Sequence, residues 1–162
     1  MSQPVMRCHF DGACEPKNPG GNMGIGAYAA IEKNELFTYS EYIPEARSNS
    51  NNVAEYKGFI AVAKFLKSYI ETNIHGIVRI DIRGDSNLVV QQVNGKWRIK
   101  NGYYVQYAHE AKALFLEIAD LCTKHNILLS LKWVPKDMNG RSDELSKKGM
   151  KENNCEFRIQ KQ

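Results

Sequence analysis

Four acidic side chains are placed where carboxylates could do chemistry together: Asp11, Glu55, Asp85 and Asp143. Asp11 and Asp85 each follow an apolar, strand-like run, so each is predicted to lie at the end of a strand. Glu55 and Asp143 each fall in the first turns of a predicted helix. Because strand ends and helix starts can meet at one edge of a sheet, we expect the four carboxylates to converge there.

Carboxylates that converge repel one another, and a divalent cation relieves that repulsion. Hard oxygen ligands favour Mg²⁺, and Mn²⁺ can substitute. Two such ions about 3.5–4 Å apart can activate a water, hold a phosphodiester and stabilise the leaving oxygen. The pattern therefore indicates metal-dependent hydrolysis of a phosphodiester.

Each carboxylate also has an ordinary structural alternative. Asp11 could stabilise a turn, Glu55 could interact with a helix dipole, and Asp85 and Asp143 could stabilise helix starts. For any one residue taken singly, the structural role is the commoner of the two. The functional interpretation depends on the order of the elements and on the residues around each acid.

The expected elements are three strands, a helix, a strand, two helices, a strand and a final helix. A Gly- and Pro-rich stretch, 11–24, predicts a turn region after the first strand. Asn51 or Asn52 is the expected cap of the first helix. The predicted strands are 5–10, 24–34, 36–44, 76–84 and 127–134, and the predicted helices are 51–66, 87–95, 104–125 and 141–153. This order predicts an α/β fold with a mixed five-stranded sheet, three antiparallel strands then two parallel ones, and helices on both faces.

The composition fits one globular domain. The chain has 162 residues, of which 43% are hydrophobic and 25% charged, so we expect a domain over 1–152 and a C-terminal tail over 153–162. A formal charge of +4 suits a polyanionic partner but is common in other proteins. The four cysteines form no C-x-x-C pair, which indicates reduced thiols. No secretory signal or membrane-length apolar run is present in the sequence, so we expect no membrane association and a cytoplasmic location.

The sequence resembles the ribonuclease H type 1 family over nearly its whole length. The resemblance rests on HFDGACEPKNPGG, SNNVAEY, GDSNLVVQQ and WVPKDMNGRSDELS, which occur in the family's order. LVVQQVNGKWRIKN, which leads directly into the long helix, is similar to the compact archaeal and bacterial variant, without basic protrusion or hybrid-binding domain. The resemblance implies a ribonuclease H-like fold and an endonuclease that cuts the RNA strand of RNA–DNA hybrids, leaving 5′-phosphate and 3′-hydroxyl ends.

The resemblance also implies roles for individual residues. Asp11 would bridge two metal ions, Asp143 would help to hold the ion that activates water, and Glu55 with Asp85 would hold the other. The implied substrate contacts are Cys14 through its main chain, Asn18, Ser50, Asn51, Asn52, Asn87, Gln91, Trp97 and Asn139.

Several of these contacts have structural alternatives. Ser50 could be an ordinary helix cap, Asn51 a turn or cap residue, and Trp97 a residue that covers the edge of the core. Trp133 is predicted to pack in the core. The lysines of the first and last long helices, Lys147 and Lys151 among them, are predicted to lie on solvated faces.

The loop PKDMNG departs from the family pattern, because many members carry a His there. Lys136 or Asp137 would have to substitute, or the step would proceed unaided. Two other functions stay open: a catalytically silent nucleic-acid-binding module, and another polynucleotidyl-transfer enzyme such as a resolvase or integrase core. Double-stranded RNA is a further candidate substrate, and a monomer is the expected state.

Overall fold

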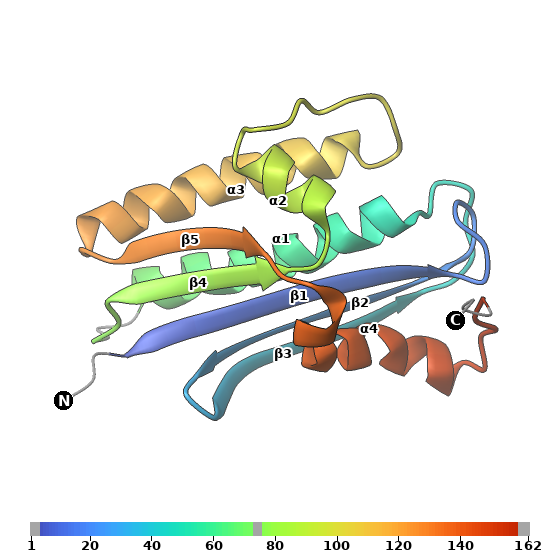
Figure 1. Cartoon of the computed structure of the whole chain (residues 1–162), viewed down its shortest axis with the longest axis horizontal. Helices are drawn as coiled ribbons and strands as arrows, with labels where there is room; N and C mark the ends of the chain where they lie inside the picture. The colour runs from blue at the N-terminus through green and yellow to red at the C-terminus, as the bar shows by residue number, and fades with distance from the viewer. Residues whose placement is uncertain (1–3, 73–75, 159–162) are drawn as a thin grey trace.

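The computed structural model describes residues 4–72 and 76–158, and Figure 1 shows how their helices and strands are arranged. The strands are β1 (Val5–Glu15), β2 (Asn22–Ile31), β3 (Asn34–Ile43), β4 (Arg79–Gly84) and β5 (Leu128–Trp133). The helices are α1 (Asn51–Thr72), α2 (Asn87–Val93), α3 (Val105–Lys124) and α4 (Gly140–Glu152), with a short 3₁₀ turn at Lys136–Met138 before α4.

The strands form one five-stranded sheet in the order β3-β2-β1-β4-β5. β1 pairs antiparallel with β2, and β2 pairs antiparallel with β3. β4 pairs parallel with both β1 and β5. The expected mixed sheet, three antiparallel strands followed by two parallel ones, is therefore confirmed.

Helices cover both faces of this sheet, and small residues let them approach closely. A Cβ atom on Gly12 of β1 would lie 2.3 Å from the backbone of Ala54 in α1, whereas one on Gly26 of β2 would lie 2.4 Å from the backbone of Ser142 in α4. Gly26 pairs with Asp11, the neighbour of Gly12, and successive residues of a strand face opposite sides. α1 and α4 therefore pack on opposite faces (Figure 1).

α1 is the central helix of the main core. Tyr56, Phe59 and Leu66 are fully buried, and α1 packs against both the sheet and α3. α3 contributes Ala108, Ala111 and Ile118 to the same core. Among the described residues, no helix has the length and apolar character needed to span a bilayer.

β1 is longer than its sequence predicts, and this moves Asp11. The strand continues through the Gly- and Pro-rich stretch to Glu15, because it pairs with β2 as far as Glu15 opposite Asn22. Asp11 is thus inside a strand, and its predicted place at a strand end is wrong. The strand that does end beside it is β4, whose last pair with β1 joins Phe10 to Gly84.

Candidate active site

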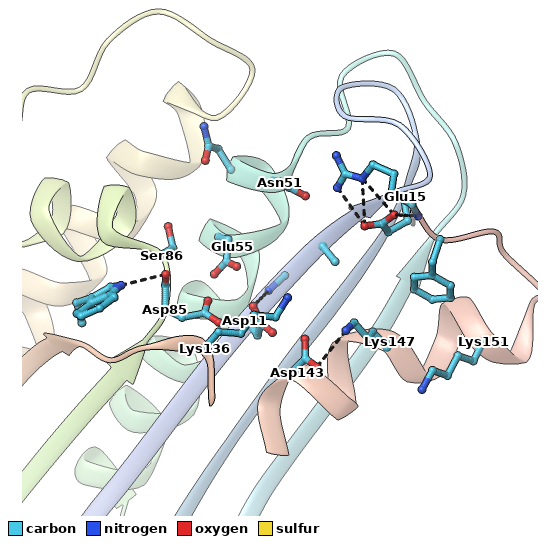
Figure 2. Close-up of a pocket in the computed structure, with 16 residues that line it drawn as sticks. Asp11, Glu15, Asn51, Glu55, Asp85, Ser86, Lys136, Asp143, Lys147 and Lys151 are labelled. Carbon is cyan, nitrogen blue, oxygen red and sulfur yellow. Dashed lines mark hydrogen bonds and ion pairs between the residues drawn. The ribbon is translucent and has the colours of Figure 1, made fainter. Parts of the chain in front are cut away.

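Three of the four predicted carboxylates converge. Asp11, Glu55 and Asp85 each offer an oxygen atom, and these atoms all lie within 4.8 Å of one another. Figure 2 shows them facing one hollow, with Asp11 on β1, Glu55 on α1 and Asp85 just beyond β4. Neighbouring strands and a helix on one face of the sheet have therefore assembled a carboxylate cluster from distant parts of the sequence.

The local structure explains how these groups meet. β1 continues past its last pair with β4, so the end of β4 leaves an opening beside Asp11. The missing side chain of Gly12 allows the first turn of α1 to approach β1, which brings Glu55 to that opening. Ser86 caps α2 by accepting a hydrogen bond from the Val89 amide, and this fixes the turn that carries Asp85.

The electrostatics of the cluster favour a bound cation. Burial raises the pKa of Asp11 to about 7, and the negative charges of Asp85 and Asp143 act in the same direction. Burial, followed by the charge of Asp11, also raises the pKa of Glu55 well above its ordinary value. Oε2 of Glu55 is buried and accepts no hydrogen bond from the described residues. A buried carboxylate oxygen without a partner, next to two further acids, fits a ligand of a divalent metal ion.

Asp143 lines the same cavity but lies outside the tight cluster. It is in the first turn of α4, and Lys147, one turn later, donates a hydrogen bond from Nζ to its Oδ2 at 3.1 Å. Gly24 and Gly26 of β2 have no side chains, so α4 can pack closely on the sheet beside Asp11. The structure thus places a fourth carboxylate at the edge of the cluster, with its charge partly balanced by a lysine.

Asn139 is buried behind the carboxylate cluster. This burial does not fit the predicted contact with substrate. Its side chain is 1% exposed. Nδ2 donates to the carbonyl oxygen of Phe10 at 2.8 Å, and Oδ1 accepts from Nδ1 of His9 at 2.9 Å. Both ends of the amide are therefore used inside the protein, where they fix the loop before α4 to the strand that carries Asp11.

The cavity around the carboxylates has a volume of about 850 Å³ and a partly basic wall. Lys136, Lys147, Lys151, Phe157 and Arg158 line it together with the acids. Lys147 and Lys151 therefore border the site, and because Lys151 is exposed as predicted, the solvated face of α4 forms part of the cavity wall. The sequence carried no local signal for Phe157 and Arg158, because a short tail has no periodicity that shows what it packs against.

Trp133 also lines the cavity, so the predicted core role is wrong. Its side chain is 50% exposed, and its indole N–H donates to the carbonyl oxygen of Asp85 at 3.2 Å. The reason is topological: β5 is an edge strand of the sheet, and Trp133 is its last residue. The indole reaches across to the turn that carries a carboxylate of the cluster.

The predicted polar contacts near α1 form a connected group. Oγ of Ser50 accepts from the Val53 amide, so Ser50 caps α1 in place of the expected Asn51 or Asn52. Oδ1 of Asn51 accepts from the Cys14 amide at 2.8 Å, and Oδ1 of Asn18 accepts from the Asn51 amide at 3.0 Å. Asn51 and Asn52 line the cavity.

The thiol of Cys14 is fully buried, which leaves only its main chain for the contact that the resemblance implies. The Cys14 amide donates to Asn51, and its carbonyl oxygen accepts a hydrogen bond from Arg158.

The remaining predicted contacts lie on and after α2. Nε2 of Gln91 donates to Oδ1 of Asn87, one turn earlier on the exposed side of the helix. Trp97 is 47% exposed in the segment between α2 and α3. These three residues are outside the cavity that holds the carboxylates, on the neighbouring surface.

Comparisons with known proteins agree with this geometry. The family model for RNase H matches residues 3–151. The bifunctional protein Rv2228c of Mycobacterium tuberculosis is 28% identical over 136 residues, which are 80% of this chain and 32% of that protein. The chain therefore spans about a third of the length of that relative.

Two solved structures share the fold over most of both chains. The N-terminal RNase H domain of Rv2228c, fused to maltose-binding protein, has a TM-score of 0.70 and 25% identity, and the match covers 89% of this chain and 97% of that one. LC11-RNase H1 in complex with an RNA/DNA hybrid has a TM-score of 0.67 and 26% identity, and the match covers 92% of this chain and 99% of that one.

The family match spans nearly the whole sequence, and it agrees with the mixed sheet and with the carboxylate cluster at the end of β4. This chain therefore belongs to the RNase H family, with type 1 domains among its structural neighbours.

Proposed function

We propose that this protein is an endonuclease that hydrolyses the RNA strand of RNA–DNA hybrids by a two-metal-ion mechanism, leaving 5′-phosphate and 3′-hydroxyl ends. The observation that carries the proposal is the cluster of Asp11, Glu55 and Asp85, in which a buried oxygen of Glu55 accepts no hydrogen bond from any residue that the structure describes. The three carboxylates line a cavity of about 850 Å³. A protein of the same fold, LC11-RNase H1, binds an RNA/DNA hybrid.

Mg²⁺ is the proposed cofactor, and Mn²⁺ could replace it. Asp11, at the centre of the cluster, would contact both ions, Glu55 and Asp85 would hold one, and Asp143 would help to hold the other. Bound in this way, the ions would supply an activated water and would stabilise the leaving oxygen. Burial raises the pKa of Asp85, and the positive charge of Lys136, which lines the cavity, opposes this rise.

The protein's own polar groups would orient the hybrid. A hybrid nuclease must sense 2′-hydroxyl groups in a shallow minor groove, and short amide side chains suit this task. Asn51 and Asn52 line the cavity, and Asn18 holds the main chain of Asn51. Ser50 would contact a phosphate of the DNA strand while it caps α1, and Cys14 would contribute its main chain.

The surface beside the cavity would bind the DNA strand. Asn87 and Gln91 present their side chains together, and Trp97 is exposed between Lys96 and Arg98. An exposed aromatic ring between two cations can pack against a deoxyribose while the cations contact phosphates. Because one chain holds all four carboxylates, we propose that the enzyme works as a monomer.

One assay tests this proposal against its rivals. End-labelled RNA–DNA hybrid, double-stranded RNA and DNA duplex are each incubated with the protein in Mg²⁺, in Mn²⁺ or in chelator. We expect the RNA strand of the hybrid to be cut only with a divalent ion, and the end groups to be a 5′-phosphate and a 3′-hydroxyl. Cleavage confined to DNA would replace the proposal with a resolvase-like activity, and binding without any cleavage would favour a silent module.

A further inference from the structure

The chain beyond α4 turns back toward the end of β1 (Figure 1). After the helix ends, the Cys155 amide donates to the carbonyl oxygen of Met150, which turns the chain back toward the sheet. The Arg158 amide then donates to Oε2 of Glu15, the last residue of β1, at 2.8 Å. Phe157 and Arg158 consequently line the cavity that contains the carboxylates.

The guanidinium of Arg158 is held in one orientation by β1. Its Nε and Nη2 donate to the carboxylate of Glu15 at 3.0–3.3 Å, and Nη2 also donates to the Cys14 carbonyl oxygen at 2.9 Å. Among the described residues, Nη1 makes no hydrogen bond, and the side chain remains 45% exposed. An arginine that is fixed on one side and open on the other has lost its rotamer freedom before a ligand arrives.

A second cation on the same wall has no acidic partner. Lys151 is exposed on α4 and lines the cavity, and it makes no ion pair with any described residue. Lys147, one turn earlier, is instead paired with Asp143. Figure 2 shows both lysines along α4, with Glu15 at the far end of the hollow from Asp85. Arg158 and Lys151 therefore both have donors to offer an incoming anion on this wall.

We propose that Arg158 and Lys151 each contact a phosphate of the strand being cut, beyond the scissile bond, and so add a phosphate-binding subsite to the active site. The inference rests on the proposed function, because it requires a nucleic acid in the cavity. With the scissile phosphate at the carboxylates, neighbouring phosphates of that strand would follow the cavity walls. Four nearby carboxylates repel a phosphate, so a phosphate on this wall needs cationic side chains to bind. A pre-oriented guanidinium can donate two hydrogen bonds to phosphate oxygens.

A purely structural role for Arg158 makes a different prediction. If the arginine only ties the chain end to β1, then breaking the tie from either side should have the same effect on binding. If Arg158 contacts a phosphate, then Arg158→Met removes the contact, whereas Glu15→Gln keeps the cation and removes a competing carboxylate. The two substitutions should then act in opposite directions on affinity for the nucleic acid.

The experiment measures binding separately from cleavage. Fluorescence anisotropy with a labelled RNA–DNA hybrid in chelator gives the Kd over a range of salt concentrations for the wild type, Arg158→Met, Lys151→Met and Glu15→Gln. The matched control is Lys33→Met, which removes one positive charge at the exposed β2–β3 turn. Thermal melts confirm that each variant is folded, and a parallel cleavage assay of the wild type tests the proposed function itself.

The slope of log Kobs against log salt is negative, and each phosphate contact that is lost should reduce its magnitude by roughly 0.7–0.9. We expect that decrease for Arg158→Met and for Lys151→Met, no decrease for Lys33→Met, and equal or tighter binding for Glu15→Gln. The subsite would be overturned if both cavity variants kept the wild-type slope, or if Arg158→Met and Glu15→Gln weakened binding equally. Cleavage of the hybrid by the wild type would still uphold the proposed function in either case. A wild type that neither binds nor cuts the hybrid would overturn both.

Discussion

Asn139 and Phe10 are joined by a hydrogen bond from Nδ2 to the carbonyl oxygen, at 2.8 Å, across 129 positions of the sequence. Because His9 also donates to the same amide, the loop before α4 is attached to the two residues that precede Asp11. This bond couples the position of Asp143, four residues after Asn139, to the carboxylate cluster.

Asn139→Ala should therefore affect both stability and activity. The substitution leaves the Phe10 carbonyl and the His9 ring without their buried partner, which costs about 1–3 kcal/mol of unfolding free energy. It should also lower the rate of hybrid cleavage, because Asp143 is no longer fixed. Urea unfolding and an initial-rate assay measure the two effects.

The control for that variant is Asn153→Ala, which removes an exposed amide bond to the Gly149 carbonyl oxygen. Its effect should stay within about 0.5 kcal/mol. Equal losses in the two variants would contradict a special role for Asn139.

Gly12→Ala tests the close approach of α1 to β1. The new Cβ would lie 2.3 Å from the backbone of Ala54, so the helix that carries Glu55 must shift. We expect a loss of about 1–3 kcal/mol in unfolding free energy, together with reduced cleavage. Urea denaturation measures the unfolding free energy, and an initial-rate assay measures cleavage. Gly140→Ala is the matched control, since its Cβ would meet no atom within 4 Å, and a similar loss there would refute the packing argument.

Asp11→Asn should abolish Mg²⁺-dependent cleavage while the fold is kept. Loss of a charged group that contacts both ions should reduce the rate by more than about 100-fold, the upper end for residues that only support a ligand. Cleavage rates in Mg²⁺ and circular dichroism spectra measure the two effects. Near-wild-type turnover by the folded variant would refute the site assignment.

In the absence of metal, the stability of Asp11→Asn relative to the wild type should increase as pH rises. The folded-state pKa of Asp11, about 7, is above its ordinary value of 3.8. The folded wild type therefore binds this proton more tightly than the unfolded chain does, and stability from this group is lost as pH rises from about 4 to about 7. Asn cannot ionise, so the variant's advantage should grow across that window to the order of a few kcal/mol. Urea unfolding in chelator at several pH values measures it, and a constant difference would contradict the prediction.

Mg²⁺ binding should release protons and strengthen with pH. The ion binds the ionised carboxylates, whereas burial keeps Asp11 protonated below about 7. The increase in Tm on adding Mg²⁺ should therefore be small at pH 6 and larger at pH 8. Calorimetry in buffers of different ionisation enthalpy measures the protons released, which should decrease above the pKa. A pH-independent increase in Tm, or the same increase in Asp11→Asn, would show that Mg²⁺ binds elsewhere.

Much of the architecture follows from local sequence patterns. Helical periodicity predicted α3 and α4 to within one residue at each end, because a buried stripe must repeat with the turn of its own helix. It also predicted the start of α1, but this helix continues six residues beyond its predicted end, to Thr72. Asn94 and Gly95 correctly marked the end of α2. Gly12, in contrast, was predicted to lie in a turn region, and only the packed helices show that Gly12 and Gly26 are contact points.

For the site, the sequence by itself determined the carboxylates and the order in which the elements carry them. Only the tertiary structure decided that Asp11 lies inside a strand, that Asn139 is buried, that Trp133 is exposed and that Arg158 reaches the cavity. The physical reason is that a local pattern reports which face of its own element a residue occupies. Burial and partners also depend on which other element covers that face, and here those elements lie up to 144 positions away.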